Sequence, residues 1–427
     1  MLKVIIYSEQ SSNRLLYVLT WIFRDFCSFQ MTHDLSVLNA HDGPGICYGK
    51  INSQTKAIQI PDSGYLWTPE VASVLPESAM VHFPITHLET DIFSFIFFSL
   101  SRAEEYGMED RDTFGRFKAE NSLAYKNGFL KLPYADLVKA ELFESISKKW
   151  PAFQVPLPVY NRQITYDIDV AWAYLHRSFF RHTYGVIRDI LHGNFFAIRD
   201  RWQVLNHLKE DPFFTFSRIL KIHAELEDSP VFFCLMGNKS KIDRAVGVHS
   251  GAFKQLIRDL ASKYIIGLHP SLKSGSNIKE LKREYTLLCT YAEKEIIHSR
   301  QHYLLINLPG TYQNLIDIGV KNDYSMGYAS ECGFRAGTCF PFLWFDIEKD
   351  ICTELTVHPF QAMDVTFWVY GQNTKEKILS ALKDIENQCR AVGGTFTFIA
   401  HNSSFSGPGT WEKWEDIYVK FLNDENI

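Results

Sequence analysis

The chain has 427 residues, of which 46% are hydrophobic and 22% charged, so it can bury substantial cores in two or more domains. Its formal net charge of −5 leaves no basic surface to hold a phosphate backbone, which argues against nucleic acid as a partner. Aromatic residues make up 15% of the chain, and we expect most of them in cores, although such rings also stack on sugars.

The start of the chain predicts a cytoplasmic protein. Residues Lys3 to Tyr7 resemble a first strand and lack the long apolar core and cleavage site of a secretory signal. The longest apolar run, Ile92 to Leu100, is far shorter than the roughly 20 residues of a membrane helix, so no transmembrane segment is expected. Eight cysteines without a CxxC pair indicate reduced thiols rather than a disulfide framework.

The first part of the chain has the pattern of a small α/β domain. After the strand at Lys3 to Tyr7, helical patterns cover Asn13 to Phe26, Asp91 to Tyr106 and Tyr134 to Lys149. Three prolines between Pro151 and Pro158 then predict an extended connector. We therefore expect an N-terminal domain over residues 1–155 and a second domain over 156–427.

The second part alternates apolar runs with helical patterns. The runs that predict strands are Ile164 to Val170, Val231 to Met236, Tyr264 to Leu268, Ile296 to Ser299, Thr353 to Val357 and Thr395 to Ala400. Such alternation over about 270 residues favours an α/β fold with a parallel sheet, and a (β/α) barrel over a doubly wound sheet. No glycine-rich phosphate loop follows any of these runs.

Polar residues follow the predicted strands, where the reactive groups of a parallel barrel lie. Because side chains alternate along a strand, Asp167 and Asp169 point to the same face. Two close carboxylates are stabilised by a cation, and together with imidazoles they suit zinc or a similar divalent ion. A lone Asp or His at a strand end is more often a helix cap or a satisfied loop residue. Further candidates at the strand ends are His269, Arg300, His302, His401 and Asn402.

The same positions resemble the polysaccharide deacetylases, the family four carbohydrate esterases, whose fold is a distorted (β/α) barrel. The segment Thr165-Tyr166-Asp167-Ile168-Asp169 resembles their first motif, and Gly267-Leu268-His269-Pro270-Ser271 resembles their histidine motif. Arg300-Gln301-His302-Tyr303 lies where their arginine motif is expected, Gly333 to Thr338 resembles a further arginine loop, and Phe398 to Asn402 resembles the final histidine strand. The order of these segments matches over about 240 residues.

The resemblance implies a role for each matching position. Asp167 would be the general base, Asp169 and His269 would bind the metal, and His401 would be the general acid. Arg300 would orient the base, and a backbone N–H near Tyr303 would face the developing oxyanion.

One position departs from the family pattern. The second histidine of the metal motif is replaced by Lys273, which would repel a cation unless it points away. We expect His302 to complete the metal site, with a hydrogen-bonded structural histidine as the alternative.

Several other residues are candidates for substrate binding. Arg335 could bind an anionic group or anchor its loop, and Asp364 could hold Arg335 or His401 in position or lie in a simple turn. Trp411 could cover a sugar or pack against the barrel. Tyr303 and Asn402 complete the set of expected substrate contacts.

The leading hypothesis is a metal-dependent deacetylase acting on an N-acetylated sugar or glycan precursor. Segments Ser101 to Tyr106 and Gly115 to Phe117 resemble the domain that precedes the barrel in some bacterial members, to which we attach no chemistry. The alternatives are an inactive barrel that binds carbohydrate or a protein partner, and a hydrolase of a non-sugar amide. The pattern does not predict the oligomeric state.

Overall fold

The first part of the protein is built on a small parallel sheet. The computed structural model describes residues 3–50, 54–83, 88–156, 158–177, 179–225, 229–238, 243, 247–371, 374–407 and 411–423. The four strands pair in the order β2-β1-β3-β4 and all run parallel. Their bounds are β1 (Lys3–Ser8), β2 (Ser28–Thr32), β3 (Gly45–Tyr48) and β4 (Ile58–Ile60).

Helices pack beside this sheet largely where the sequence predicts them. They are α1 (Asn13–Phe23), α2 (Leu35–Asn39), α3 (Ile92–Ser101), α4 (Leu123–Lys126) and α5 (Tyr134–Lys149). Helix α1 begins after Ser12, whose side chain accepts a hydrogen bond from the N–H of Leu15. Helix α3 ends five residues before the predicted Tyr106, because Arg102 adopts a left-handed backbone conformation with φ of 54°.

The second part contains a nine-stranded sheet. Its strands pair in the order β10-β11-β9-β8-β7-β6-β5-β13-β12. Every neighbouring pair is parallel except β10 and β11. The strands are β5 (Asn161–Ile168), β6 (Val231–Leu235), β7 (Ile265–His269), β8 (His298–Ser299), β9 (Asn322–Asp323), β10 (Phe342–Asp346), β11 (Ile351–Val357), β12 (Ala362–Met363) and β13 (Thr395–His401).

This sheet does not close among the described residues. Strands β10 and β12 each pair on one side only, so the α/β prediction holds but the expected barrel is not confirmed. The short strands β8, β9 and β12 have two residues each, too few to continue the ladder around a full barrel.

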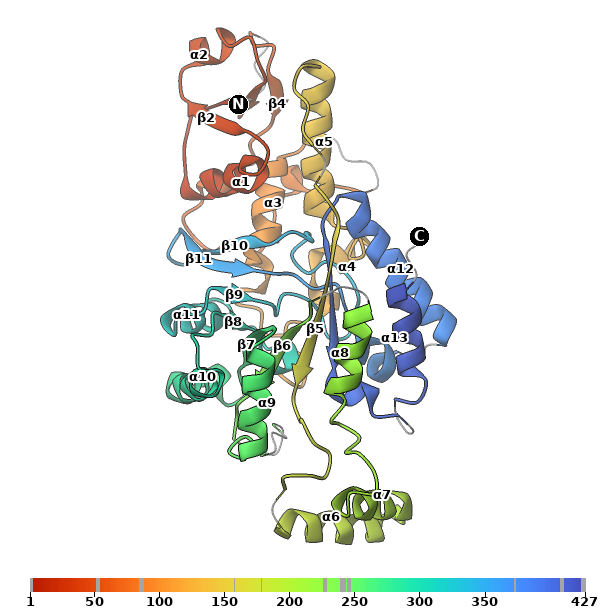
Figure 1. Cartoon of the computed structure of the whole chain (residues 1–427). Helices are drawn as coiled ribbons and strands as arrows, with labels where there is room; N and C mark the ends of the chain where they lie inside the picture. Colours follow the sequence, from red (N-terminus) through yellow and green to blue (C-terminus); the bar gives the residue numbers. More distant parts are fainter. Residues whose placement is uncertain are drawn as a thin grey trace.

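Helices surround the large sheet, with α9, α10 and α11 to one side and α8, α12 and α13 to the other (Figure 1). A pair of helices, α6 and α7, extends below them. The bounds are α6 (Phe179–Leu191), α7 (Phe195–Leu205), α8 (Phe216–Glu225), α9 (Gly251–Ala261), α10 (Ile278–Ala292), α11 (Gly310–Asp317), α12 (Lys375–Ala391) and α13 (Trp414–Asn423).

Buried contacts join the two parts of the chain. The hydroxyl of Tyr17 in α1 donates to the carbonyl of Leu343 in β10 at 2.7 Å, and the rings of Tyr17 and Phe345 lie 5.1 Å apart. One hydrophobic cluster includes buried residues of both parts. The predicted boundary near residue 155 falls between α5 and β5, and the independence of the two domains stays a prediction.

No helix of the described chain is long and apolar enough to cross a membrane. The longest apolar run, Ile92 to Leu100, lies in α3, whose ten residues are all buried. All eight cysteines are unpaired in the structure.

Candidate metal centre

The candidate site lies at the carboxyl end of the large sheet. Strand β5 ends at Ile168, so Asp167 is its penultimate residue and Asp169 follows it directly. Asp167 and His401 are paired neighbours on β5 and β13. On the other side, His269 ends β7. The parallel arrangement therefore brings together residues that are more than 230 positions apart in the sequence.

Three of the predicted residues form a cluster with the geometry of a metal site. The ligand atoms of Asp169, His269 and His302 all lie within 4.8 Å of one another. The Oδ1 atom of Asp169 is 3.2 Å from Nε2 of His269 and 3.5 Å from Nε2 of His302. Ligands about 2.0 Å from a tetrahedral ion would be separated by about 3.3 Å, so the donor set fits zinc.

The hydrogen bonds of the two histidines fix which ring nitrogen faces the cluster. Nδ1 of His269 lies 2.6 Å from the carbonyl oxygen of Arg300, and Nδ1 of His302 lies 2.8 Å from Oδ1 of Asp243. A carbonyl and a carboxylate accept hydrogen bonds, so Nδ1 is the protonated nitrogen in both rings. In the neutral tautomers, the Nε2 lone pairs then face Asp169, as in metal-binding histidines.

In this arrangement the Nε2 lone pairs of His269 and His302 both face Oδ1 of Asp169, which is itself a hydrogen-bond acceptor. Oδ1 of Asp169 is buried and has no hydrogen-bond donor among the described residues. Two imidazole lone pairs and one carboxylate oxygen repel one another unless a cation lies between them or the rings are protonated. The donor set is therefore suited to a divalent ion, and metal binding stays a prediction.

The electrostatics of the cluster favour positive charge at its centre. Burial raises the pKa of Asp169, but the charges of the nearby His302 and His401, when these rings are protonated, outweigh it and hold that pKa well below its usual range. Burial lowers the pKa of His302, but Asp169 and Asp243 outweigh it and raise the pKa to about 9. The carboxylates thus stabilise a cation, whether a proton or a metal ion.

Arg300 positions the predicted base. Its Nη1 donates to Oδ1 of Asp167 at 2.9 Å and to Oγ1 of Thr165 at 2.8 Å, and its Nε donates to the carbonyl of Tyr324. The guanidinium lies over the ring of Phe233, 4.4 Å from its centroid. The other oxygen of Asp167 remains directed at the cluster, 3.8 Å from Nε2 of His269.

Asp364 holds the predicted acid. Its Oδ1 lies 2.8 Å from Nδ1 of His401, and its Oδ2 accepts from the backbone N–H of His401 and the hydroxyl of Ser404. Nε2 of His401 therefore faces the site, 3.9 Å from Oδ2 of Asp169. Burial lowers the pKa of His401, but Asp364, Asp169 and Asp167 outweigh it and raise the pKa to about 10. Asp364 is fully buried and bonded to His401, so of the roles expected for it the structure favours holding His401 in position over contact with substrate.

Lys273 does not belong to the cluster. Its side chain is largely exposed and its Nζ lies 3.9 Å from a carboxylate oxygen of Glu280 on α10. The residue that departs from the family pattern thus points toward solvent and Glu280. His302 lies in the cluster with Asp169 and His269, and its role as the third ligand stays a prediction.

The structure corrects two further substrate predictions. Arg335 is buried and donates to both oxygens of Glu105, at 2.9 and 2.6 Å, so it is a loop anchor unavailable to substrate. In the same loop Gly337 has φ of +73°, and a Cβ there would meet Tyr134 at 2.3 Å. Asn402 is also buried, and its amide donates to the carbonyls of Val170 and Phe213.

Aromatic side chains border the site. Tyr303 follows His302 directly, and its ring lies 4.4 Å from that imidazole and stacks on Phe114 at 4.8 Å. Arg116 donates to the carbonyl of Tyr303 and to the hydroxyl of Tyr370. We call Phe114, Tyr303 and Tyr370 the aromatic rim. Trp411 is partly exposed and stacks on Trp368 with ring centroids 5.9 Å apart, so its contact with substrate stays a prediction.

Sequence reasoning did not identify Asp243, Phe114 or Tyr370. Asp243 lies in no helix or strand, so no periodic pattern marks it. The segment Gly115 to Phe117 carries only a resemblance to which no chemistry is attached. Its position beside the site depends on tertiary contacts between the two parts of the chain.

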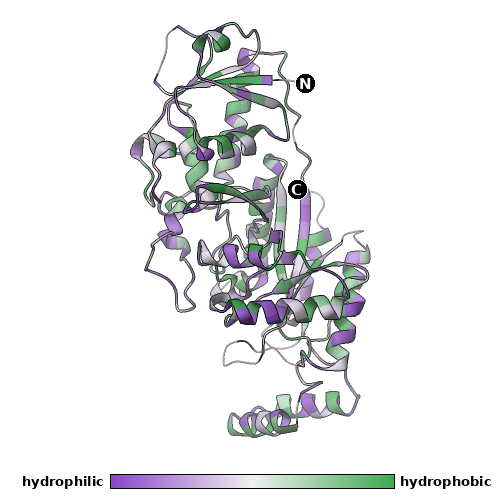
Figure 2. Cartoon of the chain, turned by 90° about the vertical axis from the view of Figure 1, so that its left-hand side faces the viewer, coloured by the Kyte–Doolittle hydropathy of each residue, from purple (hydrophilic) through white to green (hydrophobic). Residues whose placement is uncertain are grey.

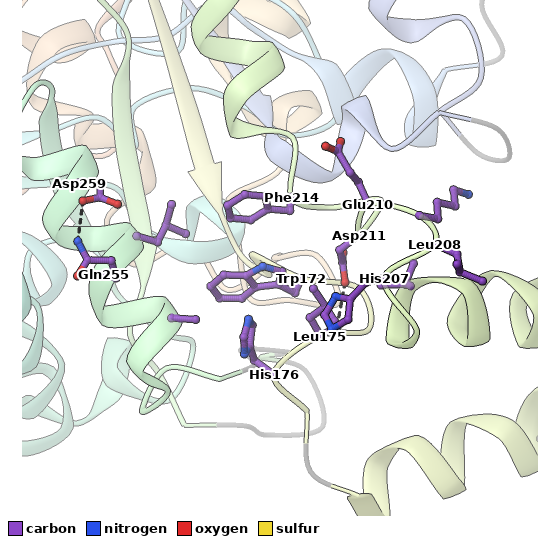
Figure 3. Close-up of a pocket in the computed structure, with 14 residues that line it drawn as sticks. Trp172, Leu175, His176, His207, Leu208, Glu210, Asp211, Phe214, Gln255 and Asp259 are labelled. Carbon is purple, nitrogen blue, oxygen red and sulfur yellow. Dashed lines mark hydrogen bonds between the residues drawn. The ribbon is translucent and has the colours of Figure 1, made fainter.

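A cavity of the described chain lies apart from this cluster. It has a volume of about 680 Å³ and lies between α9 and the segment that joins β5 to α6 (Figure 3). The rings of Trp172 and Phe214 stack along it, 5.6 Å apart, and Gln255 bonds to Asp259 on its far wall. None of the predicted site residues lines this cavity.

Comparisons with known proteins find one matching family model and several similar solved structures. Residues 4–151, about a third of the chain, match the model of a family of unknown function, DUF7033. No curated protein sequence matches significantly. Among solved structures, a protein described as a polysaccharide deacetylase from Mycobacterium smegmatis is 16% identical, with a TM-score of 0.41; the match covers 64% of this chain and 86% of that one. The carbohydrate deacetylase Agd3 is 8% identical with a TM-score of 0.39, over 100% of this chain and 84% of that one. Likenesses at this level say nothing about catalytic residues.

Proposed function

We propose that this chain is a metal-dependent hydrolase that removes the acetyl group of an N-acetylated sugar or glycan precursor. One observation carries the proposal: Nε2 of His269 and Nε2 of His302 converge on the buried carboxylate oxygen Oδ1 of Asp169, a donor set that suits a divalent cation when both rings are neutral. A carboxylate and an imidazole in positions for a base and an acid flank that cluster.

Two residues of the chain carry out the two proton transfers of the reaction, one as a base and one as an acid. Asp167, held by Arg300, takes a proton from the attacking water. His401, held as a cation by Asp364, gives a proton to the departing amine nitrogen. A divalent ion held by Asp169, His269 and His302 would act as a Lewis acid toward the amide carbonyl and lower the pKa of water. The buried contacts of Arg300 and Asp364 keep both proton-transfer groups in place.

The aromatic rim supports a sugar as the substrate. Phe114 and Tyr370 are both partly exposed beside the candidate site, and aromatic faces pack against the apolar faces of sugar rings. Arg116, which lies over both rings, fixes their positions. The rim joins Phe114 of the first part of the chain to Tyr303 and Tyr370 of the second part, which gives the first part a place in substrate binding.

The test combines metal analysis with acetate release from N-acetylated sugar oligomers. We expect bound zinc or a similar ion in the wild type, and roughly a 100-fold or greater loss of acetate release in Asp167→Asn with its metal retained. Asp346→Asn is the matched control, because Asp346 is a buried carboxylate bonded to Gln313, outside the site.

Two results would contradict the proposal. Equal acetate release by wild type and Asp167→Asn would remove Asp167 as the base. Failure of the wild type to bind any divalent metal would favour an inactive binding module, and hydrolysis of only non-sugar amides would favour the other alternative.

A further inference from the structure

Helices α6 and α7 form a hairpin that carries many large apolar side chains on its surface. The hairpin extends from the body at the end opposite the four-stranded sheet, in both views (Figures 1 and 2). Phe180 is 83% exposed and Leu191 is 78% exposed. The other exposed large apolar residues of the two helices are Phe179, Tyr184, Ile187, Ile190, Phe195, Phe196, Trp202 and Leu205. Soluble monomers rarely expose apolar patches larger than a few hundred Å².

The inner side of the hairpin is polar. Arg201 of α7 is buried and donates to Asp189 of α6 at 2.7 Å, and Asp189 also pairs with Arg188. Gly185 leaves room for the guanidinium, since a Cβ there would lie 2.7 Å from Arg201. The ion pair thus fills the helix contact, and the apolar side chains point outward. This polarity is the reverse of that expected for a helix pair in water.

The apolar residues recur at helical spacing. Phe180, Tyr184, Ile187 and Leu191 follow one another at intervals of four, three and four residues, which places them on one face of α6. On α7, Trp202 and Leu205 are three residues apart and exposed. Each helix therefore has an apolar face without a partner in the described chain.

The exposed charge of the hairpin is positive, although the chain has a net charge of −5. Residues 179–205 contain four arginines and two aspartates, and both aspartates, Asp189 and Asp200, are buried in ion pairs. Arg188 and Arg199 are exposed beside the apolar face. Helices that lie in the interface of an anionic bilayer have this composition, with phenylalanine, tryptophan and leucine next to arginine.

We propose that the α6–α7 hairpin binds the surface of a membrane that contains anionic lipids. A second copy of this chain fits the surface less well, because it would bring the same arginines together. The hairpin follows β5 in the chain, and the carboxyl end of that strand points toward it (Figure 1). A membrane bound at the hairpin would therefore lie on the side of the sheet that carries the candidate site. This proposal concerns lipid binding only and does not depend on the proposed reaction.

Vesicle flotation with the full chain tests the proposal. We expect the wild type to float with vesicles of phosphatidylcholine and phosphatidylglycerol, to float less with phosphatidylcholine alone, and to lose binding as salt increases. The triple variant Phe180→Gln, Leu191→Gln, Phe196→Gln should bind at least roughly tenfold more weakly, since each removed side chain contributes apolar surface.

The matched control is the double variant Val74→Gln, Val159→Gln, which removes exposed apolar side chains outside the hairpin. It should float like the wild type. Circular dichroism and thermal unfolding of each variant establish that it is folded. No flotation of the wild type with anionic vesicles would overturn the proposal. So would a stable dimer in light scattering that the triple variant converts to a monomer, because the apolar face would then be an interface between copies.

Discussion

His302 and Asp243 form a buried pair, with Nδ1 of the imidazole 2.8 Å from Oδ1 of the carboxylate. The pair turns Nε2 of His302 toward Asp169. Oδ1 of Asp243 also accepts from the backbone N–H of Leu272, in the turn that follows His269. Asp243 therefore connects the predicted ligand His302 to the turn that follows the predicted ligand His269.

Substitution Asp243→Asn should weaken metal binding by roughly 10 to 100 fold, because a neutral amide replaces the charged carboxylate that fixes the tautomer and orientation of the imidazole. The measurement is zinc affinity by competition with a chelating dye. Asp346→Asn, which changes another buried carboxylate, should leave the affinity unchanged. Equal affinity in Asp243→Asn and wild type would show that Asp243 does not position a ligand.

The contrast between His302 and Lys273 tests which residue completes the site. His302→Ala should reduce zinc affinity by at least roughly 100 fold, since a tetrahedral site would lose one of three protein ligands. Lys273→Ala should change it by less than about twofold, because its Nζ is exposed and directed at Glu280. The same chelator competition measures both variants. A large effect of Lys273→Ala with none of His302→Ala would contradict the assignment.

The stack of Phe114 on Tyr303 predicts a specific kinetic effect. Phe114→Ala should raise KM for N-acetylated sugar oligomers by roughly 3 to 10 fold, the effect of one lost aromatic contact, and leave kcat unchanged. The Phe114 side chain has no donor or acceptor and stacks on Tyr303, so the proton transfers and the metal ligands should not depend on it. Tyr125→Ala, at a similarly exposed ring of α4, is the control. A fall in kcat alone would exclude substrate binding at the rim.

The sequence predicted the cluster because its members lie at the ends of parallel strands. Asp167, Asp169, His269 and His401 each follow an apolar run, and such ends meet at one edge of a sheet. Tertiary pairs could not be predicted in the same way. Nothing near Arg335 in the sequence indicates that its carboxylate partner is Glu105, 230 residues away.

The sequence could not predict whether the large sheet closes into a barrel. The apolar runs give the order of strands along the chain, and their alternation with helices indicates parallel pairing. The three shortest strands carry only two residues each and leave almost no period-two pattern. The strand that ends one edge of the sheet, β10, is antiparallel to its neighbour, which alternation with helices does not predict.

The burial of Glu105 between two arginines predicts that the free energy of unfolding falls at low pH. It is buried between Arg335 and Arg102, with contacts of 2.6 to 2.9 Å. Burial raises its pKa, but the two guanidiniums outweigh it and lower the pKa from 4.5 to about 2. Between these values the unfolded chain binds more protons than the folded chain, so this contribution is present above pH 4.5 and is lost as the pH falls toward 2.

Substitution Glu105→Gln should therefore destabilise the protein at pH 7 by roughly 3 to 5 kcal/mol, because it leaves the buried Arg335 without a carboxylate and the buried Arg102 with Glu104 alone. The difference in free energy of unfolding between wild type and variant, measured by urea denaturation, should shrink by about 3 kcal/mol as the pH falls from 5 to 2. The pKa values of the buried Asp136 and Asp323 are raised by burial to about 6, and these groups act equally in both proteins, so their effects cancel in the difference. Glu144→Gln removes an exposed ion pair with Lys148 and should change stability by less than about 1 kcal/mol at any pH. A difference between wild type and Glu105→Gln that stays constant with pH would mean that Glu105 is not held ionised by the two arginines.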